Sequence, residues 1–249
     1  MTTPQLELHD ARAAAAGAPV KRSYVQRIFS EIAPRYDLLN KLLSGGIDRR
    51  WRRAAIAMLG VERRLAGAYL DLCAGTLDVG AAISRVPGFS GQVIGADFAE
   101  PMLRAGRGKA PAAVLAPVVA DALALPVAGG SCDGAIVAFG IRNVIDMPAA
   151  LREILRVLTP GARFVILEFS TPRSALVRWT YELYSRRVLP LVGALISGHP
   201  TAYQYLPDSI AQFPSSGQLK QIMSDAGFVN VAVTPLTFGV AALHVGEKR

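Results

Sequence analysis

The chain has 249 residues, of which 51% are hydrophobic and 18% are charged. This length allows one large or two small domains, and the composition excludes both a mainly disordered chain and a mini-protein that needs disulfide or metal staples. The formal net charge of +8 suits a nucleic acid, an anionic membrane surface or an acidic substrate, but the basic residues are not repeatedly interleaved with aromatic ones, which disfavours nucleic acid.

The first 60 residues divide into a tail and a helical region. Residues 1–20 are rich in alanine and lack the basic start and apolar run of a secretory signal, so we expect a mobile tail and a cytoplasmic protein. From residue 21 to residue 60 we expect a helical cap, with Val25, Ile28 and Ile32 on one face and Pro34 at the end of the first helix. Residues 44–46 predict a turn, and residues 51–59 a second helix.

Short apolar runs rich in Val and Ile follow residue 67. Continuous runs of this kind are typical of parallel strands buried on both faces. The segment between the last two runs has a helical stripe, with Asp146 as its N-cap and Pro160-Gly161 at its end. Residues 229–234 and 239–245 predict a terminal antiparallel hairpin. The predicted parallel strands are residues 68–73, 92–97, 117–121, 132–139 and 163–169.

The fold class is therefore α/β: one doubly wound, mostly parallel, seven-stranded Rossmann-like sheet in a single domain of residues 21–249. Cys73 and Cys132 lie in its apolar runs, and Cys-x-x-Cys and His-x-x-x-His spacings are absent from the sequence. We expect buried reduced thiols and no metal site.

An insertion at residues 171–216 interrupts the sheet pattern before the hairpin. Its apolar part, residues 189–196, is too short to span a bilayer. Flanked by Arg178, Arg186 and Arg187, it predicts either peripheral contact with the inner face of the membrane or a plain core helix.

Three predicted strands end in carboxylates. Asp71 precedes a turn that contains Gly75 and Thr76, and Asp97 and Asp121 end the next two strands. The carboxyl ends of parallel strands meet at one edge of the sheet, where Asp97 is placed to bind ribose hydroxyls and Asp121 an adenine amino group. Loop capping explains any one of these residues alone, but the three together favour a nucleoside site.

The glycine pattern decides between cofactors. A dinucleotide site needs three spaced glycines for its pyrophosphate, and here Gly75 stands without the other two. Asp71 would repel a pyrophosphate but could hold the cationic amino acid end of S-adenosylmethionine, directly or through water. The residues therefore favour methyl transfer over hydride transfer.

The chain resembles the menaquinone and ubiquinone biosynthesis C-methyltransferases, and the resemblance extends from Val25 to Lys248. Some of the matching segments are shared by many methyltransferases, whereas RYD, FGIRNV and AYQYLPDSI are specific to the quinone family. The matching segments are VQRIFSEIAPRYDLLN (residues 25–40), residues 71–78, DALALP (121–126), FGIRNVID (139–146), ALREILRVLTP (150–160), ILEFSTP (166–172), AYQYLPDSIAQF (202–213) and LHVGEK (243–248).

The resemblance implies that S-adenosylmethionine contacts Gly75, Thr76, Asp97, Asp121, Ala122 and the strand end at Ala138. Two residues depart from the family pattern: Leu77 replaces a usual glycine, and Ala138 a common serine. We expect the Leu77 side chain to crowd the methionine part of the cofactor unless the backbone shifts.

The resemblance also implies a prenylated quinol that is methylated on a ring carbon. Arg142 follows the fourth strand and is our candidate for stabilising the ring oxyanion, because a guanidinium stays protonated; Asn143 is a second donor. A salt bridge and an N-cap are the structural alternatives for these two residues. Tyr36 is expected to orient the cofactor or the ring, or else to be a core tyrosine.

The insertion supplies the predicted acceptor contacts. Tyr203 and Tyr205 are expected to line the ring pocket, with His199 as a candidate base or an ordinary loop histidine. The sequence leaves open another aromatic or polyketide-like acceptor, and a binding module that has lost activity through Leu77. It also leaves open the ring type, the tail length and the oligomeric state, a homodimer included.

Overall fold

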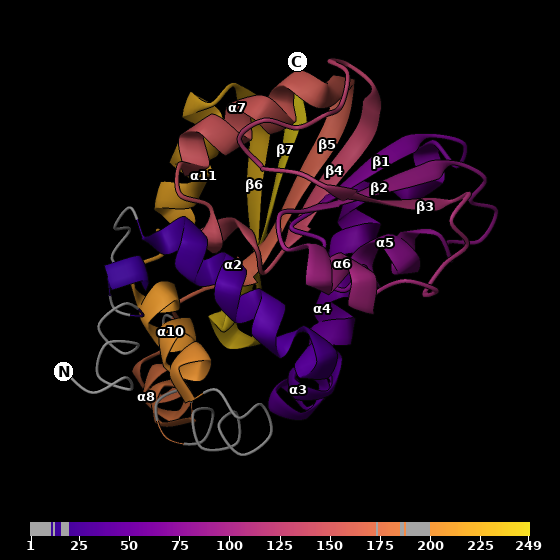
Figure 1. The fold of residues 1–249 in the computed structure, drawn as a ribbon. Helices are drawn as coiled ribbons and strands as arrows, with labels where there is room; N and C mark the ends of the chain where they lie inside the picture. Colours follow the sequence, from indigo (N-terminus) through magenta and orange to yellow (C-terminus); the bar gives the residue numbers. More distant parts are fainter. Residues whose placement is uncertain (1–10, 12, 16–19, 173, 185–186, 188–199) are drawn as a thin grey trace.

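The seven-stranded sheet is the centre of the molecule in the computed structural model, which describes residues 11, 13–15, 20–172, 174–184, 187 and 200–249 (Figure 1). The strand order is β3-β2-β1-β4-β5-β7-β6, parallel from β3 to β5 and antiparallel at β7 and β6. This order confirms the predicted doubly wound fold. The strands are β1 (Ala68–Leu72), β2 (Gln92–Asp97), β3 (Leu115–Val119), β4 (Cys132–Ala138), β5 (Leu158–Phe169), β6 (Phe228–Leu236) and β7 (Ala241–Lys248).

Alternate residues of β1 bury against the two faces of the sheet. Leu70 and Leu72 pack in the cluster that contains α7 (Met147–Val157) and α11 (Ser216–Asp225). Tyr69 packs in the opposite cluster, with α4 (Ile47–Leu59), α5 (Asp78–Ile83) and α6 (Glu100–Ala105). Both faces are thus covered by helices, as the apolar strand runs predict.

The helix α7 begins as predicted and ends differently. The Asp146 carboxylate accepts a hydrogen bond from the Ala149 amide (2.9 Å), which confirms the N-cap. The helix ends at Val157, and β5 starts at the next residue. Pro160 and Gly161 therefore lie inside the strand and do not end the helix as predicted.

The C-terminal hairpin is confirmed, with its second strand inside the sheet. β7 pairs antiparallel with β5 on one side and with β6 on the other. His244 is consequently buried on an interior strand, opposite Ile166 and Val233.

The N-terminal cap contains one more helix than the sequence indicates. α2 (Lys21–Ile32) is followed by a 3-10 turn that contains Pro34, and then by α3 (Tyr36–Ser44). Gly45 and Gly46 both have positive φ, which explains the predicted turn. The next helix, α4, begins at Ile47 rather than at residue 51.

Ala11, Ala14 and Ala15 are helical and buried against α2 and α3. These residues differ from the mobile tail that the sequence predicts for them; residues 1–10, 12 and 16–19 lie outside the described part.

The insertion contributes α8 (Ala175–Leu183) and α10 (Pro200–Ala211) beneath the cap (Figure 1). The segment 189–196, for which membrane contact was expected, lies outside the described residues. Among the helices that are described, none is both long enough and apolar enough to cross a bilayer.

Candidate active site

The turn after β1 is held by the carboxylate that ends β2. Asp97 accepts hydrogen bonds from the Gly75 and Ala99 amides, both at 2.8 Å. The side chain is buried, and burial raises its pKa. Gly75 has a φ of +52°, so its backbone approaches the strand end in a conformation that favours glycine.

Asp71 lies below this turn rather than at its surface. It is 1% exposed, and its carboxylate accepts a hydrogen bond from the Gly80 amide (2.8 Å) near the start of α5. Burial raises its pKa to about 7. In this structure the residue stabilises the helix that begins at the turn, and it is not among the residues that line the cavities described below.

Leu77 points into the core. It has a φ of +64° and is 2% exposed, in the cluster beneath α5 and α6. Its side chain occupies space that two glycines leave free: a Cβ at Gly95 would lie 2.4 Å from Leu77 Cδ2, and one at Gly106 would lie 3.0 Å from Leu77 Cγ. The expectation that Leu77 crowds a ligand above the turn is therefore wrong, because the left-handed backbone directs the side chain the other way.

A small cavity follows the carboxyl ends of β1, β2, β3 and β4; we name it the edge cavity. Its volume is about 50 Å³. The described residues that line it are Arg22, Leu72, Cys73, Ala96, Asp97, Phe98, Ala120, Asp121, Ala122, Leu123, Gly140, Asn143, Val144 and Ile145. The predicted positions Asp97, Asp121 and Ala122 thus share one site.

The helix α2 closes the edge cavity. Arg22 makes a salt bridge with Asp121 (2.9 Å), and Gln26 donates to the Phe98 carbonyl (3.2 Å). Small-molecule sites usually occupy about 300–1,000 Å³. The chemistry of the cavity suits a nucleoside, but its volume lies below this range.

The two cysteines lie in different surroundings, and both are free thiols. Cys132 is buried, as expected. Cys73 is only partly buried and lines the edge cavity, because β1 ends at Leu72 and leaves it in the turn.

An ion-pair network fastens α3 to the turn. Thr76 Oγ1 donates to Asp37 (2.5 Å), and Lys109 Nζ contacts Asp37 and Asp78, both at 2.6 Å. The RYD motif therefore contributes Asp37, which joins the cap to the loop that carries Gly75 and Thr76.

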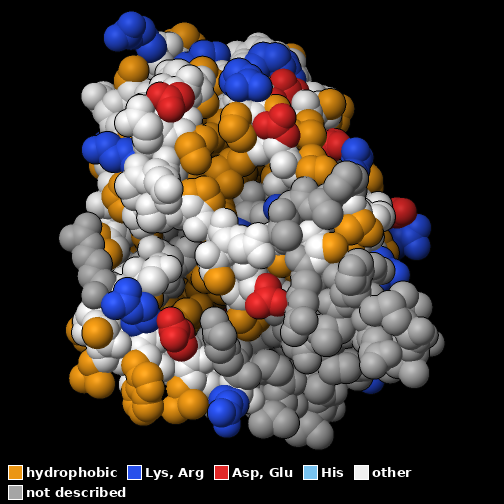
Figure 2. Space-filling model, turned by 90° about the vertical axis from the view of Figure 1, so that its left-hand side faces the viewer, with side chains coloured by type: hydrophobic (Ala, Val, Ile, Leu, Met, Phe, Trp, Pro, Cys, Tyr) orange, Lys and Arg blue, Asp and Glu red, His pale blue; other side chains and the backbone are white. Residues whose placement is uncertain are grey.

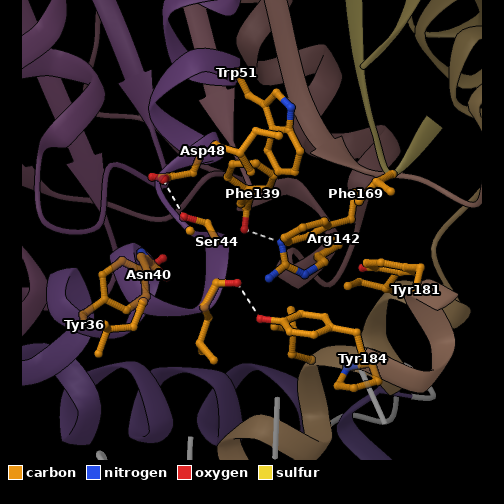
Figure 3. Close-up of a pocket in the computed structure, with 18 of the residues that line it drawn as sticks. Tyr36, Asn40, Ser44, Asp48, Trp51, Phe139, Arg142, Phe169, Tyr181 and Tyr184 are labelled. Atoms are coloured by element: carbon orange, nitrogen blue, oxygen red, sulfur yellow. Dashed lines mark hydrogen bonds between the residues drawn. The ribbon is translucent and has the colours of Figure 1, made fainter. Parts of the chain in front are cut away.

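A larger cavity lies between the cap, the insertion and the strand ends; we name it the apolar cavity. Its volume is about 600 Å³, within the range of small-molecule sites. Aromatic rings from distant parts of the chain face it, including Trp51, Phe139, Phe169, Tyr181 and Tyr184 (Figure 3). The walls also include Ile28, Phe29 and Ile32 of α2 and Leu206 and Ile210 of α10.

Arg142 brings a positive charge into this cavity. Its guanidinium contacts Glu168 (2.8 Å), donates to the Phe139 carbonyl, and lies 5.6 Å from the centre of the Phe169 ring (Figure 3). Arg142 Nε is buried with no hydrogen-bond partner, although its residue lines the apolar cavity. Glu168 is 1% exposed, and burial raises its pKa while Arg142 opposes the rise.

Asn143 and Tyr205 connect the two cavities. Asn143 lines the edge cavity and accepts a hydrogen bond from the Tyr205 hydroxyl (3.0 Å). Tyr205 lines the apolar cavity, and burial raises its pKa to about 12. Tyr36 also lines the apolar cavity and lies 4.0 Å from the Cβ position of Gly75.

Three further predicted positions, Ala138, Tyr203 and His199, are not among the described residues that line the two cavities. Ala138, the last residue of β4, packs against the core and is not among the described lining residues. The backbone of Tyr203 lies in α10, but its side chain is not among those described. His199 lies outside the described residues altogether.

A third cavity of about 570 Å³ lies on the other side of Arg142. It is lined by Lys21 of α2, Asp146 at the start of α7, and Gln212 and Phe213 after α10. The face of the molecule drawn in Figure 2 carries a hollow flanked by hydrophobic side chains. Lys21 Nζ donates to the Arg142 carbonyl (2.8 Å), so the cap also holds the segment after β4.

Several residues in or beside the apolar cavity could not be identified from the sequence. Glu168 lies in an apolar strand run, where one buried acid signals a paired charge. Trp51 lies within the arginine-rich stretch 49–53 and Asp48 directly before it, and neither the stretch nor its neighbour carries a motif for a cavity. Tyr181 and Tyr184 carry no local signal, because their position depends on how α8 packs.

Comparison with known proteins finds relatives among the methyltransferases. Residues 18–248 match the model of the ubiE/COQ5 methyltransferase family. The chain is 50% identical over 226 residues to a demethylmenaquinone methyltransferase from Thermus thermophilus, covering 89% of this chain and all of that protein. It is 45% identical to the ubiquinone/menaquinone biosynthesis C-methyltransferase UbiE of Geobacter sulfurreducens, covering 92% and 90% of the two chains.

Solved structures of lower identity share the fold. A S-adenosylmethionine-dependent methyltransferase from Thermotoga maritima superposes with a TM-score of 0.64 at 19% identity, covering 90% of this chain and 99% of that one. A phosphoethanolamine N-methyltransferase from Haemonchus contortus, in complex with S-adenosylhomocysteine, has a TM-score of 0.54 at 17% identity, covering 77% of this chain and 52% of that one.

Proposed function

Because the chain belongs to the ubiE/COQ5 methyltransferase family, we propose that it transfers a methyl group from S-adenosylmethionine to a ring carbon of a prenylated quinol of the demethylmenaquinol type. The observation that carries the proposal is the adjacency of two cavities, one with acidic strand ends and one that is apolar with a buried arginine. They meet at Asn143 and Tyr205.

The methyl donor belongs in the edge cavity. Asp97 has acceptor capacity beyond the two backbone amides that it binds, and a carboxylate accepts well from vicinal ribose hydroxyls. Asp121 is placed for the base once Arg22 releases it, with Ala122 beside it. We assign Gly75 and Thr76, in the turn that Asp97 holds, to the methionine part, although neither is among the described residues that line the edge cavity. When bound, S-adenosylmethionine supplies an electrophilic methyl group.

The acceptor ring belongs in the apolar cavity. A ring hydroxylate makes its neighbouring carbon electron-rich, and the Arg142 guanidinium stabilises that oxyanion without giving up its own proton. Asn143 lies next to Arg142 as a further polar group, although its oxygen already accepts from Tyr205. The aromatic walls hold the ring flat and keep water out, so alignment of the two substrates supplies much of the catalysis.

The mouth of the apolar cavity suits a lipid surface, which extends the proposal to peripheral membrane contact. Leu42 of α3 is 53% exposed and lines the cavity, and Trp179 of α8 is 61% exposed. The Tyr184 hydroxyl donates to the Leu43 carbonyl and joins the two elements at this mouth. Exposed Lys41 and Arg178 flank the apolar residues, a combination typical of interfacial helices.

A labelling experiment tests the activity. The purified chain is incubated anaerobically with methyl-labelled S-adenosylmethionine and a reduced, prenylated demethylnaphthoquinone. We expect label on the ring carbon of the recovered quinone. Label on an added aromatic or polyketide-like acceptor alone would redirect the assignment to that acceptor, and no label with any acceptor would overturn it.

Flotation with vesicles of phosphatidylglycerol and phosphatidylethanolamine tests the membrane contact. We expect the chain to float, and flotation to fall several-fold in a Leu176→Ser, Trp179→Ser variant. Val119 is 56% exposed on β3, away from the mouth, so Val119→Ser is the matched control. Equal flotation of all three proteins would contradict a docking role for α8.

A further inference from the structure

The two ends of the apolar cavity differ in hydrogen-bonding character. Arg142 marks one end, after β4, and Asp48 with Ser44 marks the other, where α3 meets α4; the Phe139 and Trp51 rings lie between them (Figure 3). Asp48 is the one acidic side chain among the described residues that line this cavity. The Arg142 end offers donors, because a guanidinium has no acceptor atom.

The Asp48 end offers carboxylate oxygens as acceptors, and Arg52, which also lines the cavity there, adds a guanidinium whose buried Nε has no hydrogen-bond partner. The Ser44 hydroxyl donates to Asp48 Oδ1 (2.7 Å) and accepts from the Gly46 amide (3.0 Å), so its single proton is already used. Arg52 contacts Asp48 Oδ2 at 3.3 Å but lies closer to Asp78, at 2.7 Å. An ionised carboxylate has about four lone-pair positions. Asp48 therefore keeps acceptor capacity after these two contacts.

The charges around Asp48 leave this end negative. Arg52 is shared between Asp48 and Asp78, and Lys109 between Asp78 and Asp37. Three carboxylates thus face two cations in one connected network. The Asp48 side chain is only 11% exposed, which reduces screening by solvent.

We propose that Asp48 determines the reduction state of the ring that this cavity accepts. The inference rests on the proposed quinol acceptor. A quinol presents a hydroxyl proton at each oxygen, whereas a quinone presents two carbonyl acceptors. Arg142 donates to either kind of oxygen, but Asp48 accepts only from a hydroxyl. A quinone carbonyl next to Asp48 places two acceptors face to face. Buried groups that are left unpaired in this way strongly reduce binding affinity.

Binding in the absence of the methyl donor tests this assignment. Calorimetry in an anaerobic cell compares a short-chain prenylated 1,4-naphthoquinone with its reduced quinol. For the unchanged protein we expect the quinol to bind about tenfold tighter or more. In Asp48→Asn the amide can donate to a carbonyl, so quinone affinity should rise and the ratio fall to about one or below. Asp225 lies exposed on α11, and Asp225→Asn should keep the original ratio.

A second measurement uses the unchanged protein alone, in case Asp48→Asn does not fold. We expect 4-methoxy-1-naphthol, which keeps one hydroxyl, to bind within a few-fold of 1,4-naphthalenediol, and 1,4-dimethoxynaphthalene to bind about tenfold weaker or more. Equal affinities for the three compounds would overturn the assignment, as would an unchanged quinol-to-quinone ratio in Asp48→Asn. Failure of every ring compound to bind would overturn the quinol acceptor itself, which separates the two failures.

Discussion

The edge cavity and the apolar cavity are built in different ways. The edge cavity comes from four neighbouring strand ends, and its carboxylate Asp97 is fixed by the amides of Gly75 and Ala99. The apolar cavity is assembled from α2, α3, α4, α8 and α10, segments that are far apart in the chain. Strand ends of a parallel sheet lie together by topology alone, whereas the apolar cavity exists only after the helices have packed.

The largest expected effect concerns Asp71, the buried carboxyl group below the turn that follows β1. Asp71 has a pKa raised from 3.8 to about 7 by burial. Between these values the native chain holds a proton that the unfolded chain has released, so this group lowers the free energy of unfolding as pH rises from about 4 to about 7. The full change is about 4 kcal/mol.

Thermal or urea unfolding of Asp71→Asn across this pH range checks the effect. Because the amide does not titrate, we expect the stability of the variant relative to the unchanged protein to improve steadily up to about pH 7. Parallel stability curves for the two proteins would mean that Asp71 titrates normally.

The second prediction tests whether Arg142 acts in the apolar cavity rather than in the edge cavity. Arg142→Ala removes the Arg142 guanidinium from the apolar cavity, and we expect turnover to fall about 100-fold or more, as when an oxyanion donor is lost. Affinity for S-adenosylmethionine, measured by calorimetry, should change less than about threefold, since the Arg142 side chain is not among the described groups of the edge cavity. Equal losses in both quantities would place Arg142 at the donor instead.

The third prediction concerns the side chain beneath the turn. Leu77→Gly relieves a left-handed backbone, worth about 1–2 kcal/mol, but empties core volume that costs about 2–5 kcal/mol. We expect a net destabilisation of about 1–3 kcal/mol and unchanged cofactor affinity. An increase in affinity with little loss of stability would show that the leucine had blocked the site after all.

The smallest expected effect is on the closure of the edge cavity. Arg22 is 60% exposed, so its bridge to Asp121 contributes at most about 1 kcal/mol. Arg22→Ala frees Asp121, and we expect affinity for S-adenosylmethionine to rise by less than about fivefold. A loss of affinity would show that Arg22 itself contacts the nucleoside.

The same contrast explains what could be predicted from the sequence. The strands, the Asp146 cap and the grouping of Asp97, Asp121 and Ala122 follow from apolar runs and local spacing. The direction of the Leu77 side chain could not be predicted from the adjacent sequence, because it depends on the space that Gly95 and Gly106 leave free. Glu168 was missed because its partner Arg142 comes from a distant element. Asp48 has local partners, Ser44 and Arg52, but the helices that enclose the cavity around it come from distant parts of the chain.

One helix forms a wall of both cavities. Arg22 and Gln26 of α2 hold the loops after β3 and β2, while Ile28, Phe29 and Ile32 of the same helix face the acceptor side. A tilt of α2 that admits one substrate therefore also changes the shape of the cavity that receives the other. The binding free energies of the two substrates are then coupled, and each substrate must change the affinity of the protein for the other by the same factor.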